Sequence, residues 1–238
     1  MFRFRGHVLL TKVYCLPGTM CDERLWELTQ QELGGSFSLQ HVAIPQKDTI
    51  ESIIDALAVV LPAEPMNLLG FSMGGYLACA FAVKYPERVK RLMVLSNTAS
   101  GLLDTERQQR EVALNWVTKK GYNGIPKKKA IAMLGPSNKD RADLLDVIVA
   151  MDRALGEVVF IQQLKSSLVR PDLLLMLKKA GLSLCFVVGE EDALLSKAVL
   201  EDMQNVKQLK VKTLNDCGHM LPLEQPTLLA ELVKDFYL

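Results

Sequence analysis

A serine flanked by glycines, in the order Gly70-Phe71-Ser72-Met73-Gly74, is the feature that most constrains this chain. It lies between a short apolar run, 65–69, and an uncharged stretch of small and apolar residues, 76–83. Glycines two residues before and after the serine allow a sharp turn from a strand into a helix, because side chains there would clash. Such a turn exposes the serine hydroxyl and directs the first N–H groups of the helix toward an incoming carbonyl oxygen. The motif therefore predicts a strand, a tight turn and a helix, with Ser72 as a candidate nucleophile.

Short apolar runs alternate with longer segments of helical spacing, a pattern typical of parallel β-α-β units. The expected strands are 8–16, 38–44, 66–69, 91–96, 182–188 and 209–214. The expected helices include 49–61, 73–85, 196–205 and 226–236. This order predicts an α/β fold with a mostly parallel central sheet flanked by helices.

The middle of the chain differs from the rest. Residues 98–167 are rich in charge, helical in pattern and without strand-like runs. We expect them to form a helical cap inserted into one core domain, which would comprise residues 1–97 and 168–238.

The composition excludes several classes of function. The chain has 238 residues, of which 49% are hydrophobic and 23% charged, as in a globular protein. Its net charge of +1 gives no indication of nucleic acid or an anionic membrane as a partner, so we expect a small-molecule substrate. Five scattered cysteines without a C-x-x-C pair favour buried, reduced thiols in a cytoplasmic protein over a disulfide framework or a zinc site.

Two segments have to be weighed as export or membrane signals. Near the N-terminus, arginines precede an apolar stretch, but Lys12 interrupts it and no small-residue cleavage site follows. Residues 66–83 carry no charge, yet the glycines in their middle fit a strand, a turn and a buried helix better than a membrane span. We therefore expect neither an export signal nor a membrane segment.

A nucleophilic serine needs a base, and histidine is the usual one. The chain has three histidines. His7 precedes the first expected strand and should be exposed, and His41 lies within a strand-like run. His219 follows the last expected strand on a loop, 216–222, from which its side chain can reach the edge of the sheet. We expect His219 to be the base for Ser72.

A carboxylate must orient this histidine. Asp192 follows the strand 182–188 and is our choice, with Glu190, Glu191 and Asp216 as competitors. The order Ser-Asp-His along the chain is one of the known arrangements, and all three residues follow strands, as ligand-binding residues of open α/β sheets do.

The oxyanion of an acyl-transfer intermediate needs two N–H donors. The Met73 N–H, directly after the nucleophile, is one of them. The second should come from the loop after the first strand, where Gly18 allows an unusual backbone geometry and either Thr19 or Met20 can donate.

Four segments resemble the α/β-hydrolase family, in its small, cap-bearing bacterial form: LPGTMCDERLW, GFSMGGYLACAFAVKYPERVKRLMVLS, VVGEEDAL and DCGHMLPLEQP. The resemblance covers nearly the whole chain outside the insertion. It implies Ser72 as nucleophile, His219 as base, Asp192 as acid, and no cofactor.

Two departures from the family affect the pocket entrance. Pro17-Gly18 stands where many relatives have His-Gly, and AIPQKDTIES replaces a glycine-rich D-x-P-G-x-G-x-S stretch. Arg170-Pro171-Asp172 resembles a feature of this branch, and we expect it to anchor the cap to the core through an ion pair.

The substrate pocket is harder to predict. The candidate lining residues share an apolar or aromatic side chain, and packing of the cap is the alternative for most of them. They are Phe71, Trp116, Met220, Met133, Leu134, Met151, Met20 and Met73. The basic residues 127–129, with Lys119 and Lys120, could steer an anionic substrate, but we favour a solvated helix face.

These inferences favour a serine hydrolase that cleaves a small carboxylic ester or thioester through an acyl-enzyme. A carbon–carbon bond hydrolase or a menaquinone-pathway-type lyase with the same triad is the alternative within enzymes. A ligand-binding, receptor-like protein on the same fold is the alternative of another class. A homodimer is left open.

Overall fold

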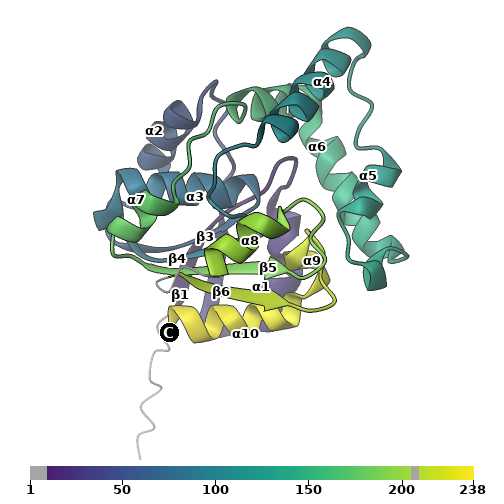
Figure 1. Cartoon of the computed structure of the whole chain (residues 1–238). Coiled ribbons are helices and arrows are strands. Elements are labelled where there is room, and N and C mark those ends of the chain that lie inside the picture. The colour runs from purple at the N-terminus through teal and green to yellow at the C-terminus, as the bar shows by residue number, and fades with distance from the viewer. Residues whose placement is uncertain (1–9, 205–208) are drawn as a thin grey trace, which may run out of the picture.

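The protein is built on one six-stranded sheet in which every neighbouring pair of strands is parallel (Figure 1). The structure is a computed structural model that describes residues 10–204 and 209–238. The strand order is β2-β1-β3-β4-β5-β6. The strands are β1 (Thr11–Leu16), β2 (Phe37–His41), β3 (Met66–Phe71), β4 (Val89–Leu95), β5 (Ser183–Gly189) and β6 (Lys210–Leu214). The prediction of an α/β fold with a parallel central sheet is confirmed.

Helices connect the strands and cover the sheet. They are α1 (Glu27–Leu33), α2 (Ile50–Val60), α3 (Met73–Lys84), α4 (Asp104–Lys120), α5 (Lys127–Ala132), α6 (Ala142–Ser166), α7 (Leu174–Lys179), α8 (Lys197–Gln204), α9 (Leu221–Glu224) and α10 (Pro226–Tyr237). Short 3₁₀ turns lie at Glu23–Trp26, Gly34–Ser36, Pro86–Arg88 and Pro136–Asn138. The expected start of the first strand at Val8, His7, and the expected end of the helix 196–205 fall outside the described residues.

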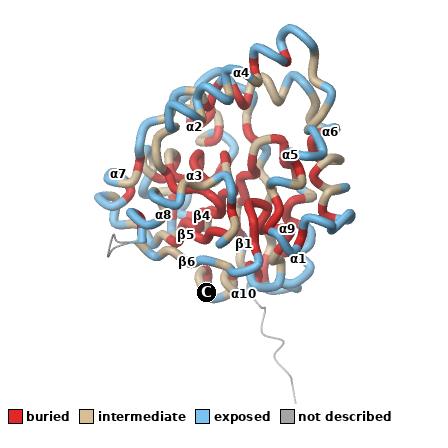
Figure 2. The backbone as a smooth tube through the Cα atoms, turned by 45° about the vertical axis from the view of Figure 1, so that its right-hand side comes forward, coloured by how far each residue is buried: buried red, intermediate tan, exposed pale blue. Residues whose placement is uncertain are grey.

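Two apolar cores form, one on each face of the sheet. On one face, α1 and α10 pack together against Val13, Cys15 and Leu69. On the other, α2, α3 and α7 pack against Leu68 and Leu92. The buried segments gather at the centre of the molecule, as the red tube in Figure 2 shows. The four inner strands are apolar on both faces because both faces are covered.

Helices α4, α5 and α6 lie between β4 and β5 in the chain and stand together beyond one edge of the sheet (Figure 1). Helix α6 bends at Gly156, where φ is 72°. Leu144, Ile148 and Met151 of α6 join the apolar core on the α1 side. The segment 98–167, called the insertion below, is therefore packed on the sheet domain, and its assignment as a helical cap inserted into the core domain stays a prediction.

Two further observations concern the described residues as a whole. None of their helices is both long and apolar enough to cross a membrane. All five cysteines are buried and free, and no group of three or more metal-binding side chains is found in the described part of the chain.

Candidate active site

Ser72 lies at the junction of β3 and α3, with φ of 50° and ψ of −116°. A Cβ atom on Gly70 would lie 2.4 Å from the carbonyl oxygen of Gly74, and one on Gly74 would lie 2.2 Å from that of Leu16. Both positions therefore require glycine. The Ser72 N–H donates to the Leu95 carbonyl (2.9 Å), which fixes the turn to β4. The strained serine at this turn is consistent with a functional role.

His219 connects Ser72 to Asp192. Its Nε2 lies 2.9 Å from Ser72 Oγ, and its Nδ1 lies 2.8 Å from Asp192 Oδ2. His219 is 5% exposed and Asp192 7%, whereas Ser72 is half-buried. Asp192 follows β5 and His219 follows β6, so the structure brings the three side chains together at the carboxyl edge of the sheet.

Both the backbone and the ring of His219 are held in place. The backbone N–H of His219 donates to the Met133 carbonyl (2.8 Å), and Ser96 Oγ donates to the backbone carbonyl of His219 (2.9 Å). The Phe71 ring lies against the imidazole with centroids 5.3 Å apart. Asp192 Oδ1 accepts the Leu194 N–H (2.9 Å), which leaves Oδ2 for His219. The ring and the carboxylate therefore have defined positions before any ligand binds.

The competing carboxylates have other surroundings. Glu191 accepts the Cys217 N–H (2.8 Å) and so joins the loops after β5 and β6. Glu190 and Asp216 are exposed. His41 is half-buried at the end of β2, and burial lowers its pKa. Among the histidines and carboxylates considered from the sequence that lie within the described residues, only the His219 side chain bonds to Ser72, and only Asp192 bonds to the His219 ring.

Two backbone N–H groups lie near Ser72. Met73 is the first residue of α3, and its sulfur lies 3.5 Å from Thr19 Oγ1. A Cβ atom on Gly18 would lie 3.3 Å from Ser72 Cβ, so the loop after β1 approaches the serine closely. No hydrogen bond within the described part of the chain uses the N–H of Thr19 or Met73.

The Met20 N–H, the alternative to Thr19, is already occupied. It donates to Oε1 of the buried Gln163 in α6 (2.9 Å). Met20 has φ of 56°, and the Cys21 N–H donates to the Gly18 carbonyl (3.2 Å), which closes a turn with Thr19 at its apex. A side chain of the insertion thus accepts the Met20 N–H, which favours Thr19 over Met20 as the second donor, and both assignments stay predictions.

The candidate pocket residues differ in how far they are buried. Trp116 is 65% exposed on α4, which argues against the pocket role expected for it, because its helix turns Leu114 and Val117 inward instead. Phe71 is buried beside His219, and Met220 is fully buried in the core. The remaining candidates stay predictions, although Leu134 and Met151 are buried in the same core.

Sequence reasoning missed two residues that act on the site. One is Gln163, described above. The other is the buried Glu224, whose carboxylate accepts from Gly135 N–H (2.7 Å), Asn138 Nδ2 (3.0 Å) and Gly218 N–H (3.1 Å). It thereby joins the insertion to the residue before His219. An acid among leucines and prolines, in LPLEQP, was the available signal.

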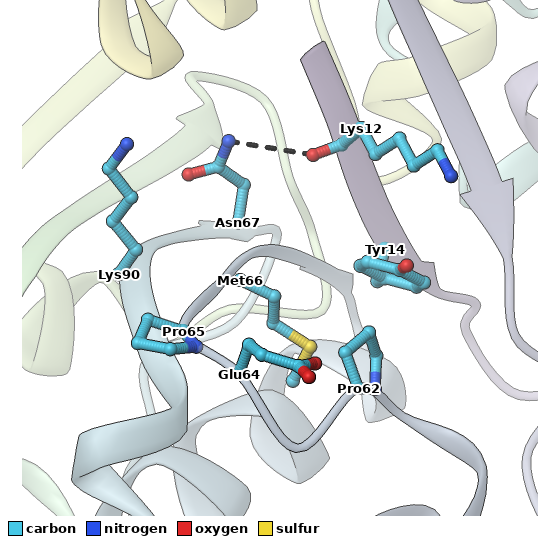
Figure 3. Close-up of a pocket in the computed structure, with 8 residues that line it drawn as sticks. All are labelled: Lys12, Tyr14, Pro62, Glu64, Pro65, Met66, Asn67 and Lys90. Atoms are coloured by element: carbon cyan, nitrogen blue, oxygen red, sulfur yellow. Dashed lines mark hydrogen bonds between the residues drawn. The ribbon is translucent and has the colours of Figure 1, made fainter. Parts of the chain in front are cut away.

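Two hollows of the described surface lie away from Ser72. One, of about 230 Å³, is lined by Lys12, Tyr14, Pro62, Glu64, Pro65, Met66, Asn67 and Lys90 (Figure 3). Since Met66 begins β3 and Ser72 follows its end, this hollow lies at the opposite edge of the sheet. The other, of about 310 Å³, lies beside α1 and β2 and includes Trp26 and His41. Neither is lined by Ser72, Asp192 or His219.

Comparison with known proteins agrees with this architecture. A model of the α/β hydrolase fold matches residues 46–130. A thermophilic esterase from Thermogutta terrifontis superposes with a TM-score of 0.79 at 24% identity, covering 94% of this chain and 88% of the other. An enol-lactonase from Burkholderia xenovorans gives 0.76 at 17% identity, covering 95% and 91%. The chain has the α/β-hydrolase fold. The resemblance found in the sequence is confirmed at this level.

Matches to curated relatives are shorter. An abhydrolase domain-containing protein of Caenorhabditis elegans is 34% identical over 94 residues, which are 38% of this chain and 20% of the relative. A putative 2-succinyl-6-hydroxy-2,4-cyclohexadiene-1-carboxylate synthase of Bacillus subtilis is 24% identical over 184 residues, 74% of this chain and 67% of the relative. The chain thus spans about a fifth of the first of these proteins and two thirds of the second.

Proposed function

We propose that the protein is a serine hydrolase that cleaves a small carboxylic ester or thioester through an acyl-enzyme on Ser72. The observation that carries the proposal is the position of His219, within hydrogen-bond distance of both Ser72 Oγ and Asp192 Oδ2. A weak hydroxyl nucleophile becomes reactive when a base accepts its proton and a third group orients that base.

The reaction follows from this geometry. His219 Nε2 accepts the Ser72 proton as Oγ bonds to the acyl carbon, and Asp192 stabilises the imidazolium that forms. The oxyanion receives the N–H groups of Met73 and Thr19, a type of donor whose removal costs about 3–4 kcal/mol of transition-state stabilisation. The imidazolium gives its proton to the leaving alcohol or thiol. Water, deprotonated by His219, then cleaves the acyl-enzyme and restores Ser72.

A fluorophosphonate probe tests the nucleophile. We expect wild-type protein to be labelled at Ser72, as located by peptide mass spectrometry, and Ser72→Ala to remain unlabelled. The same variant should lose at least about 10³-fold in turnover of short p-nitrophenyl esters. Ser183→Ala, at the exposed start of β5, is the matched control and should behave as wild type. Labelling elsewhere, or equal turnover by Ser72→Ala, would refute the proposal.

Carbon–carbon bond hydrolysis or a lyase reaction is the second candidate. It is favoured by the Bacillus subtilis synthase, which aligns with 74% of this chain. A panel of esters, thioesters, lactones and carbon–carbon substrates separates the two, because a lyase would turn over its substrate without a labelled or acylated Ser72. The receptor-like alternative requires a ligand that raises the melting temperature and is recovered unchanged.

A further inference from the structure

The loop that follows β4 contacts the backbone of both Ser72 and His219. Its first residue, Ser96, donates through Oγ to the backbone carbonyl of His219 (2.9 Å). The next residue, Asn97, is 7% exposed and donates through Nδ2 to the carbonyl of Ser72 (3.0 Å). A buried amide from outside α3 therefore holds the carbonyl of the candidate nucleophile.

This bond fixes the plane of one peptide. The Ser72 carbonyl also accepts the Tyr76 N–H (3.1 Å), so with Asn97 it has a partner for each of its two lone pairs. The carbonyl shares a planar trans peptide with the Met73 N–H, which points the opposite way. Met73 is the first residue of α3, so its N–H has no acceptor within that helix. Holding the carbonyl therefore sets the direction of the N–H that is proposed to bind the oxyanion.

An amide matches the two groups that the Asn97 side chain meets. Its Oδ1 accepts the Ala99 N–H (2.7 Å), while its Nδ2 faces the Ser72 carbonyl. These partners decide which way round the amide lies, because the reverse would set donor against donor and acceptor against acceptor. A carboxylate would present a second acceptor to the Ser72 carbonyl, and a hydroxyl has only one polar atom. The bond to Ser72 thus accounts for an amide at this position.

The surroundings of Asn97 hold it close to α3. A Cβ atom on Gly75, in the first turn of α3, would lie 3.0 Å from Asn97 Cβ, so the glycine lets the two segments approach. Ser96 and Ala99, before and after Asn97, have φ of 49° and 57°, conformations that persist where the surroundings enforce them. The Ala99 carbonyl accepts the Leu173 N–H (3.0 Å), which fastens the loop to the segment that returns from the insertion. Asn97 therefore holds Ser72 from a loop that is itself fixed.

The ion pair expected at Arg170 of this returning segment is long. Glu106 Oε2 lies 3.8 Å from Arg170 Nη2, too far for a hydrogen bond. The carbonyl of Pro171 instead accepts the Tyr76 hydroxyl (2.7 Å), which joins the segment to α3. Hydrogen bonds to the loop and to α3, rather than a close ion pair, therefore attach this segment to the core.

We propose that Asn97 is a positioning residue of the oxyanion site: by holding the Ser72 carbonyl, it directs the Met73 N–H toward the side on which the oxyanion forms. A hydrogen bond to the carbonyl also polarises the N–H of the same peptide, which makes that N–H a better donor. Asn97 acts through Met73 and is not itself a catalytic residue. The inference rests on the proposed hydrolase function for the oxyanion, but the hold on the Met73 N–H can be tested without turnover.

Asn97→Ser separates the two bonds of this side chain. The serine oxygen can keep the local bond to the Ala99 N–H, as in the turns that serine and asparagine share, but nothing replaces Nδ2. We expect kcat for p-nitrophenyl acetate to fall about tenfold to a hundredfold and KM to stay within about twofold, because one oxyanion donor is misdirected but not removed. Asn67→Ser is the matched control and should behave as wild type. Asn67 also donates through Nδ2 to a carbonyl, that of Lys12 (3.5 Å), but it lies at the opposite end of β3.

A matched pair of ligands shows whether the effect lies in the oxyanion site. Butyl trifluoromethyl ketone adds to a nucleophilic serine: Oγ bonds to the carbonyl carbon, the hydroxyl proton passes to the histidine, and the carbonyl oxygen becomes an oxyanion. The corresponding trifluoromethyl carbinol has nearly the same shape but forms neither the bond nor the oxyanion. We expect Asn97→Ser to raise the calorimetric Kd of the ketone by about the factor by which kcat/KM falls, and to leave that of the carbinol within about twofold. An equal change for both ligands, or for neither, would overturn the proposal.

Nuclear magnetic resonance of protein that contains isotopically labelled methionine observes the Met73 N–H without turnover. Its signal is assigned by comparison with Met73→Leu. We expect Asn97→Ser to move this signal and Asn67→Ser to leave it in place. Asn97→Asp, which sets an acceptor against the Ser72 carbonyl, should also move it and covers the case in which Asn97→Ser does not fold. An unmoved signal overturns the proposal even if esters are cleaved. A moved signal in a protein that cleaves no ester and binds no ketone retains the hold of Asn97 on the peptide and refutes the hydrolase.

Discussion

Ser72 is one of five non-glycine residues of the described chain that have a positive φ. The others are Met20, Ser96, Ala99 and Asp216. All five lie in loops that follow the carboxyl ends of β1, β3, β4 and β6. Such conformations cost about 1–3 kcal/mol each and persist where the surroundings enforce them. The chain therefore concentrates its backbone strain at the edge that carries Ser72 and His219.

Gly74 tests the turn that creates this strain. We expect Gly74→Ala to lower the free energy of unfolding by about 1–3 kcal/mol, because the added methyl meets the backbone of Leu16 and Pro17. It should also abolish ester turnover and probe labelling. Gly35→Ala is the matched control, since a Cβ there meets nothing within 4 Å. Chemical denaturation measures both variants, and equal stabilities would contradict the close contact.

Substitution of Gln163 tests the link from the insertion to the loop 18–21, which carries the proposed oxyanion donor Thr19. Gln163→Leu leaves the Met20 N–H without its acceptor, which should cost about 1–3 kcal/mol of stability. Because the turn then loses its fixed geometry, we expect kcat to fall more than KM rises. Gln109→Leu, on the exposed side of α4, should leave both constants unchanged. An unaltered kcat in Gln163→Leu would mean that the turn needs no support from α6.

The residues of the site differ in how far the sequence predicts them. Ser72, Asp192 and His219 were found because each follows an apolar run that could be assigned to a strand. The choice between Thr19 and Met20 could not be made, because it depends on Gln163, which lies 143 residues from Met20.

Among the elements, the short helix α9 joins the insertion to the loop that carries His219. Its last residue, Glu224, accepts hydrogen bonds from the insertion and from the loop that carries His219. The strands were predicted from their apolar runs. The strand β2 is shorter than expected: it ends at His41, where the chain leaves the edge of the sheet, and not at Ile44. The helix boundaries of the insertion were not predictable, because few buried residues mark the faces of a mostly exposed helix such as α4.

Substitution of Glu224 tests the contribution of helix α9 to the site. Glu224→Gln replaces one accepting oxygen with an NH₂ group that faces N–H donors. We expect a loss of about 1.5–3 kcal/mol of stability and a reduced kcat, because Gly218 is released next to His219. Glu231→Gln, exposed on α10, is the control. A variant as stable and active as wild type would show that the remaining contacts of His219, to Met133 and Ser96, suffice.

At the scale of the whole molecule, all five thiols are buried in the two apolar cores. Burial raises the pKa of Cys21 to about 12 and that of Cys15, Cys79, Cys185 and Cys217 above the ordinary value of 9.0. Because the thiolate is the reactive form, native protein should react with less than one equivalent of a disulfide reagent at pH 8, and unfolded protein with five. Several fast equivalents in the native protein would contradict the burial.

The same shifts predict how stability depends on pH. Above pH 9 the unfolded chain loses its thiol protons while the folded chain keeps them, so the folded state binds more protons and its stability falls as pH rises. One fully buried thiol contributes up to about 1.4 kcal/mol per pH unit. Urea denaturation at pH 8, 9 and 10 should give a shallower decline for Cys79→Ala than for wild type. Parallel declines would disprove the contribution of Cys79.

Because all five native cysteines are buried, they should not compete with an engineered surface cysteine for a labelling reagent. Val158, on α6 in the insertion, is 70% exposed, so a cysteine placed there would be the single reactive thiol among the described residues. A fluorophore attached at that point would report directly whether the insertion shifts against the sheet as a ligand enters, without any native cysteine having to be removed first.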